Sequence, residues 1–169
     1  MVSYYVKRGY IFFCEDETTY SLKPHTARGW YPKGSRPTVE FNFTRKRFHA
    51  YGAVNGRKEH YRFYQQINWK NTLNFLKYLH YKYSKLFIIW DNPTWHRHHK
   101  VKKYLKKNHI KTLEFPTCTP ELNPIEQAWK TTKQKTANKH YSNIQEYLKQ
   151  VKHAIQQKNL TKIYQYLSN

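Results

Sequence analysis

Leu86-Phe-Ile-Ile-Trp-Asp91 is the stretch that best indicates the fold of this chain. Five apolar residues in succession are typical of a strand buried on both faces, as in parallel sheets that helices cover on both sides. An aspartate closes the run, and the same pattern occurs earlier in Tyr10-Ile-Phe-Phe-Cys-Glu-Asp16. These are the only two aspartates among 169 residues. We therefore expect Asp16 and Asp91 to end neighbouring strands of one sheet.

The residues between the two aspartates predict an antiparallel β-meander. A hairpin or loop rich in Pro, Gly and Lys is expected over 21–37, followed by two or three strands, roughly over 38–43, 48–54 and 58–65. Asn55-Gly56 lies between the last two strands, and Asn-Gly is the strongest short-range signal for a hairpin.

The second half of the chain changes to alternating helices and strands. The apolar spacing predicts helices over 69–83, 95–107, 123–137 and 144–155, a short last helix over 160–167, and strands over 85–91 and 110–115. This order predicts a single α/β domain over residues 1–169, built on a mixed sheet.

The charge of the chain indicates its partner. Thirty-one Lys and Arg against ten Asp and Glu give a net charge of +21, which favours a polyanion such as double-stranded DNA. No segment approaches the roughly 18 apolar residues of a membrane-spanning helix, and the N-terminus lacks a signal-peptide pattern. Two cysteines are too few for a disulfide framework. We expect a cytoplasmic, nucleoid-associated protein with no membrane partner.

A third acid, Glu126, lies at a strong helix start. Asn123 suits the N-cap and Pro124 the first helical position, so Glu126 falls at the third. One interpretation is a capping box, in which the glutamate serves only the helix end. That interpretation explains neither aspartate.

The other interpretation joins all three acids in one site. If Asp16, Asp91 and Glu126 meet at one sheet edge, their carboxylates could hold two Mg²⁺ ions about 3.5–4 Å apart, with Mn²⁺ as a substitute. Such a pair suits phosphoryl transfer on DNA, where one ion activates water or a 3′-hydroxyl and the other stabilises the leaving oxygen. Lys130 and Lys133 lie on the helical face of Glu126 and could contact phosphates. Trp129 either anchors this helix in the core or stacks on a base.

Longer motifs surround these acids. They are Asp91-Asn-Pro-Thr-Trp-His96, Phe115-Pro…Thr119-Pro-Glu-Leu-Asn-Pro-Ile-Glu126…Trp129…Lys133, Phe13-Cys-Glu-Asp16-Glu17, Arg28-Gly-Trp30…Gly34 and Tyr51-Gly52. Over about residues 8–135, the chain resembles the DDE catalytic domain of the mariner-like transposases, with the prokaryotic insertion sequences as the nearest branch.

The resemblance implies an RNase H-like fold and cut-and-paste DNA transposition with two catalytic Mg²⁺ ions. By the same match, Asp16, Asp91 and Glu126 are the catalytic acids and metal ligands. It also implies insertion at TA dinucleotides and a homodimer that joins two transposon ends. Family members carry an N-terminal helix-turn-helix region for end recognition. The residues before Tyr10 are too few to form one, so we expect it to be absent from this chain or encoded separately.

Several residues near the acids have two interpretations each. Asn92 either positions Asp91 or the scissile phosphate, or simply ends the strand in a turn. His96 either orients Asp91 or touches a phosphate, or packs as an ordinary core residue. Glu15 and Glu17 point to the opposite face from Asp16 by strand alternation, where we expect them to be solvated or salt-bridged.

The run His96-Arg-His-His99-Lys100 resembles a zinc-binding sequence only superficially. Adjacent histidines on a helix point in different directions, so the run is better interpreted as a basic patch facing DNA.

The leading hypothesis is thus a metal-dependent transposase domain that cleaves and joins DNA. A noncatalytic DNA-binding remnant or regulator is the first alternative, and an unrelated RNase H-like nuclease is the second.

Overall fold

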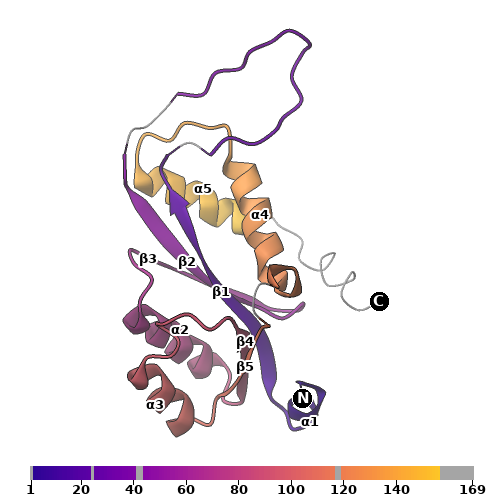
Figure 1. The fold of residues 1–169 in the computed structure, drawn as a ribbon, viewed down its shortest axis with the longest axis vertical. Coiled ribbons are helices and arrows are strands. Elements are labelled where there is room, and N and C mark those ends of the chain that lie inside the picture. The colour runs from indigo at the N-terminus through magenta and orange to yellow at the C-terminus, as the bar shows by residue number, and fades with distance from the viewer. Residues whose placement is uncertain (1, 24, 41–43, 117–118, 157–169) are drawn as a thin grey trace.

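A mixed five-stranded sheet lies between two layers of helices in the computed structural model, which describes residues 2–23, 25–40, 44–116 and 119–156 (Figure 1). The strand order across the sheet is β3-β2-β1-β4-β5. The strands are β1 (Ile11–Ser21), β2 (Arg47–Val54), β3 (Glu59–Tyr64), β4 (Leu86–Trp90) and β5 (Lys111–Glu114).

The strand pairing confirms the predicted meander. β1 pairs antiparallel with β2 and β2 with β3, and the loop that joins β2 to β3 contains Asn55 and Gly56, whose φ of +74° suits glycine. β4 runs parallel to both β1 and β5. Every residue of β4 is buried, as its continuous apolar run predicted.

Two helical layers cover the sheet. α2 (Trp69–Lys82) and α3 (His99–Lys107) pack on one face, and α4 (Pro124–Thr136) and α5 (Ile144–Gln156) on the other (Figure 1). Side chains alternate between the two cores along β1, so Phe13 joins the first core and Cys14 the second. No helix within the described ranges is long and apolar enough to cross a membrane.

Three predicted elements differ from the structure or lie outside its described part, and one helix was not predicted. The helix expected over 95–107 begins only at His99, because residues 93–98 form a turn in which the amide of His96 donates to the carbonyl of Pro93 (3.2 Å). Residues 38–40 form no strand, since the segment after Pro37 belongs to the loop that extends away from the sheet; residues 41–43 lie outside the described part. The expected last helix over 160–167 also lies outside it. The helix α1 (Val2–Lys7) was not predicted.

The expectation that Asp16 ends its strand is wrong. β1 is longer than predicted, and the added length leaves Asp16 at an edge of β1 that no neighbouring strand covers. β1 continues to Ser21 because it pairs with β2 along that length. Its parallel pairing with β4 covers only Ile11 to Cys14. Beyond Cys14, the edge of β1 that faces β4 is therefore free of strand pairing, and Asp16 lies just past that point.

Candidate acidic active site

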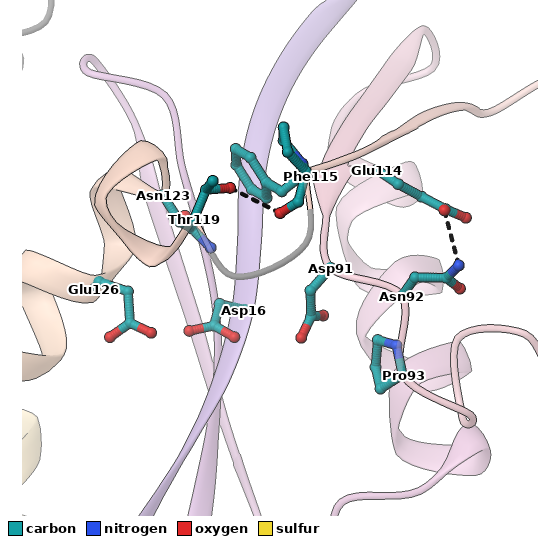
Figure 2. A pocket seen from close by; sticks show the side chains of 10 residues that line it. Asp16, Asp91, Asn92, Pro93, Glu114, Phe115, Thr119, Asn123 and Glu126 are labelled. Carbon is teal, nitrogen blue, oxygen red and sulfur yellow. Dashed lines mark hydrogen bonds between the residues drawn. The ribbon is translucent and has the colours of Figure 1, made fainter.

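The three acids predicted from the sequence line one open cavity of about 580 Å³. Figure 2 shows the carboxylates of Asp16, Asp91 and Glu126 facing the same space, from β1, from the residue after β4 and from the first turn of α4. The described residues that line it are Asp16, Asp91, Asn92, Pro93, Glu114, Phe115, Pro116, Thr119, Asn123 and Glu126.

Asp16 is held by the helix that also carries Glu126. The indole Nε1 of Trp129 donates a hydrogen bond of 2.9 Å to Asp16 Oδ2. Trp129 is buried in the core, as one interpretation of the sequence expected, and Gly52 pairs directly opposite Asp16 on β2. A Cβ at Gly52 would lie 2.7 Å from the Trp129 ring, so glycine is required for this close approach of α4 to the sheet.

The start of α4 forms as predicted and is tied to β1. The Asn123 side chain accepts from the amide of Ile125 (3.4 Å), while its Nδ2 donates to the carbonyl of Glu15 (3.4 Å). Within the described residues, the Glu126 carboxylate accepts no hydrogen bond from the amide of Asn123, so the structure does not support a capping box. Glu126 is instead exposed toward the cavity.

The electrostatics of the cavity favour a cation. Burial, followed by the charges of Glu126 and Glu17, raises the pKa of Asp16 from 3.8 to about 7, although the Trp129 hydrogen bond lowers it. Burial also raises the pKa of Asp91, against the opposing effect of His96. Asp16, Glu17 and Asp91 offer oxygen atoms that lie within 4.8 Å of one another. Hard carboxylate oxygens at an open edge fit a divalent cation such as Mg²⁺ or Mn²⁺.

His96 lies behind Asp91 and is buried, with 3% of its surface exposed. Its ring stacks on Trp90 at a centroid distance of 4.1 Å and an interplanar angle of 16°. Nδ1 lies 3.1 Å from the carbonyl oxygen of Asp91, and Nε2 lies 3.0 Å from Glu17 Oε1. This geometry suits the orienting role for Asp91. The ring has almost no exposed surface, which disfavours the alternative of a direct phosphate contact.

Glu15 and Glu17 lie on the predicted face of β1, and of the two expected states they show ion-pair contact rather than solvation, because His96 Nε2 lies 3.7 Å from Glu15 Oε2 and 3.0 Å from Glu17 Oε1. Glu15 is 1% exposed, and burial, with the charges of Glu17, Asp16 and Asp91, raises its pKa well above the ordinary value. The Glu17 side chain is 3% exposed and accepts a hydrogen bond from Trp95 Nε1 (3.0 Å). The partners of Glu15 and Glu17 could not be predicted from the sequence, because these contacts depend on how the turn over 93–98 folds back toward β1.

Asn92 lies at the rim of the cavity. Its Nδ2 donates to Glu114 Oε2 (2.8 Å) and so joins the ends of β4 and β5 (Figure 2). Among the described contacts, the Asn92 side chain makes no hydrogen bond to Asp91, which favours the structural interpretation of this residue.

Lys130 and Lys133 line a second hollow of about 450 Å³, and Glu126 lines both this hollow and the acidic cavity. The two lysines therefore lie beside the acids, on the helical face that the sequence predicted. In the basic run after Asp91, Arg97, His99 and Lys100 are exposed.

Comparison with solved structures identifies the fold class as RNase H-like. The Mos1 transposase paired-end complex with left transposon end matches with a TM-score of 0.71 at 14% identity, over 97% of this chain and 54% of that one. The mariner Mos1 paired-end complex with Mg matches at 0.69 and 14%, over 89% and 49%. The catalytic domain of Mos1 mariner transposase matches at 0.68 and 12%, over 97% and 79%.

The family follows from a direct match. The family model of the DDE superfamily endonucleases matches residues 12–158, and the chain belongs to this family. No curated protein matches the chain. The chain spans about half the length of the Mos1 transposase in its paired-end complexes.

Proposed function

We propose that this chain is the catalytic domain of a mariner-like transposase that cleaves and joins DNA with the help of Mg²⁺. The observation that carries the proposal is the meeting of three carboxylates, Asp16, Asp91 and Glu126, around one open cavity. Membership of the DDE superfamily endonucleases supports phosphoryl transfer as the chemistry.

A different structural feature positions each of the three acids. Asp16 is oriented by Trp129, and Asp91 by its direct connection to β4 and by His96 at its carbonyl. Glu126 extends from the first turn of α4 without a fixed partner among the described side chains, so it can adjust when a phosphate enters. The divalent cation held by these carboxylates would supply positive charge against the phosphate oxygens.

DNA would approach along the side of α4. Lys130 and Lys133 border the hollow next to Glu126, where they would neutralise phosphates on either side of the scissile bond. The net charge of +21 supports an extended DNA-binding surface rather than a single phosphate contact.

Further features are proposed by analogy with the whole transposases. Structures of Mos1 transposase hold a transposon end in a paired-end complex, and one holds Mg. For this chain we propose transposon ends as substrate, a TA target, an active homodimer and a prokaryotic insertion sequence as source. Because the chain covers about half of the Mos1 sequence, end recognition is assigned to a helix-turn-helix unit that is encoded with it or separately.

Cleavage of supercoiled plasmid in Mg²⁺ or Mn²⁺ tests the proposal. We expect Asp16→Asn, Asp91→Asn and Glu126→Gln each to lower the nicking rate by at least about a hundredfold, since removal of one charge-stabilising group typically costs about 10²–10³ in rate. Glu121→Gln is the control, because Glu121 is exposed and outside the cavity lining. Undiminished nicking by any of the three variants would remove that residue from the site.

A further inference from the structure

A second cluster of metal-ligating side chains lies behind the acidic cavity, on the α2/α3 face of the sheet. Glu15, Glu17 and His96 each offer one ligand atom, and these atoms lie within 4.8 Å of one another. All three side chains are buried, with relative exposures of 1%, 3% and 2%. The cluster adjoins the open cavity, because Glu17 also lies within 4.8 Å of ligand atoms of Asp16 and Asp91, but its three side chains are buried on the other face of β1.

The state of Glu15 requires explanation. Neither of its carboxylate oxygens has a hydrogen-bond partner in the described part of the chain. An ionised carboxylate without a partner is costly to bury, and a protonated one would still need an acceptor for its O–H. Glu15 Oε2 lies 3.7 Å from His96 Nε2, so the group is directed into the cluster rather than toward solvent.

The ring of His96 is oriented like that of a metal ligand. A carbonyl oxygen can only accept, so Nδ1 donates its proton to the carbonyl of Asp91. Metal-binding histidines commonly donate one ring N–H in this way and direct the other nitrogen at the ion. Nε2 faces Glu17 Oε1 at 3.0 Å and Glu15 Oε2 at 3.7 Å.

A proton on Nε2 would satisfy only part of this arrangement. An imidazolium Nε2–H can bond to Glu17 at 3.0 Å, but Glu15 at 3.7 Å remains beyond hydrogen-bond distance. A metal ion can contact all three ligands at once. Bonds of about 2.0–2.2 Å to nitrogen and oxygen in a tetrahedral site separate the ligand atoms by about 3.3–3.5 Å, and the two observed distances bracket that value.

We propose that Glu15, Glu17 and His96 bind one buried divalent d-block cation, with Zn²⁺ as the best fit, in addition to the ion proposed at Asp16, Asp91 and Glu126. An imidazole among the ligands favours Zn²⁺ over Mg²⁺, which prefers oxygen ligands alone. Trp95 Nε1 donates to Glu17 Oε1, and Trp90 stacks on the His96 ring, so both ligands are held by neighbours. The ion would join β1 to the turn that follows β4.

Metal binding by the full chain tests this proposal. The chain is stripped of metal, titrated with Zn²⁺ by calorimetry, and then loaded with Co²⁺ for absorption spectroscopy. We expect one tight Zn²⁺ per chain and the intense visible bands of a low-symmetry Co²⁺ site. Glu15→Gln keeps the size and burial of the side chain, and we expect it to weaken Zn²⁺ binding by at least about tenfold.

Glu126→Gln separates this site from the catalytic one. Glu126 lines the open cavity and belongs to neither group of ligand atoms that contains Glu17, so tight Zn²⁺ binding is expected to survive in this variant even where cleavage is lost. Absence of tight Zn²⁺ binding in the wild-type chain, or undiminished binding by Glu15→Gln, would overturn the proposal. So would ¹⁵N NMR spectra of the Zn²⁺-treated chain in which both ring nitrogens of His96 carry protons.

Discussion

At the scale of single residues, Asp16 shows how a functional group can weaken the fold that carries it. Its pKa is raised from 3.8 to about 7, which means that the folded state favours the protonated form. The contribution of such a group to stability is fully present below its unfolded pKa and is lost as the pH rises through the folded pKa. Without a bound cation, the chain therefore loses stability between about pH 4 and pH 7 because of this one residue.

Asp16→Asn removes the loss of stability that ionisation of Asp16 causes. In metal-free buffer we expect the variant to be more stable than the wild type above about pH 7, by at most about 4 kcal/mol at about 1.4 kcal/mol per pKa unit. Urea unfolding at about pH 5 and about pH 8 measures the difference, which should grow with pH. Equal differences at the two pH values would show that Asp16 titrates normally in the folded state.

Trp129→Phe isolates the hydrogen bond to Asp16. The ring stays in the core, but the carboxylate loses its indole donor, so we expect the pKa of Asp16 to rise further, by about one unit. The pH of half-maximal Mn²⁺-dependent cleavage should then move upward by a similar amount. Trp69→Phe, at the start of α2, serves as the matched control and should leave the pH profile in place.

At the scale of elements, the contact of α4 with β2 determines where Glu126 lies. Gly52 has no room for a Cβ beside Ile125 and Trp129. We expect Gly52→Ala to destabilise the fold by about 1–3 kcal/mol, as overpacking does, and to lower cleavage because α4 is displaced from Asp16. Thermal unfolding and nicking assays measure the two effects.

A double variant shows whether a steric clash with Ile125 causes the destabilisation by Gly52→Ala. Ile125→Val removes the Cδ1 atom that a Cβ at residue 52 would meet. The destabilisation by Gly52→Ala should be smaller in the Ile125→Val background than in the wild type, since the two residues are in contact. Strictly additive changes in the free energy of unfolding would exclude the steric explanation.

The sequence predicts those elements that carry a local signal and misses the features that depend on tertiary contacts. The apolar run 86–90, the Asn55-Gly56 turn and the Asn123-Pro124 helix start each carry a local signal, and all three predictions are confirmed. The length of β1 depends on its pairing with β2, which no local pattern reports. The contacts of Glu15 and Glu17 with His96 were missed for a similar reason, because the turn over 93–98 that brings His96 back to β1 is set by tertiary packing.

At the scale of the whole molecule, the positive charge predicts a strong dependence of DNA binding on salt. Each phosphate contact contributes about 0.9 to the slope of log affinity against log salt concentration. We expect the double variant Lys130→Gln/Lys133→Gln to reduce that slope by about two. Fluorescence anisotropy over a range of salt concentrations measures it.

The matched control removes the same charge elsewhere. Lys7 in α1 and Lys77 in α2 are exposed and lie outside the two hollows that Glu126 lines. The variant Lys7→Gln/Lys77→Gln should change the slope by less than about one. Equal effects of the two double variants would mean that DNA does not follow the side of α4.

Binding of Mn²⁺ to the open cavity tests the central claim most directly, namely that Asp16, Asp91 and Glu126 form one metal site. Electron paramagnetic resonance of Mn²⁺ measures the affinity in the wild-type chain and in single variants. We expect Asp16→Asn, Asp91→Asn and Glu126→Gln each to weaken Mn²⁺ binding by at least about tenfold, about 1.4 kcal/mol, while Glu121→Gln leaves it unchanged. Unaltered affinity in all three variants would contradict a shared metal site.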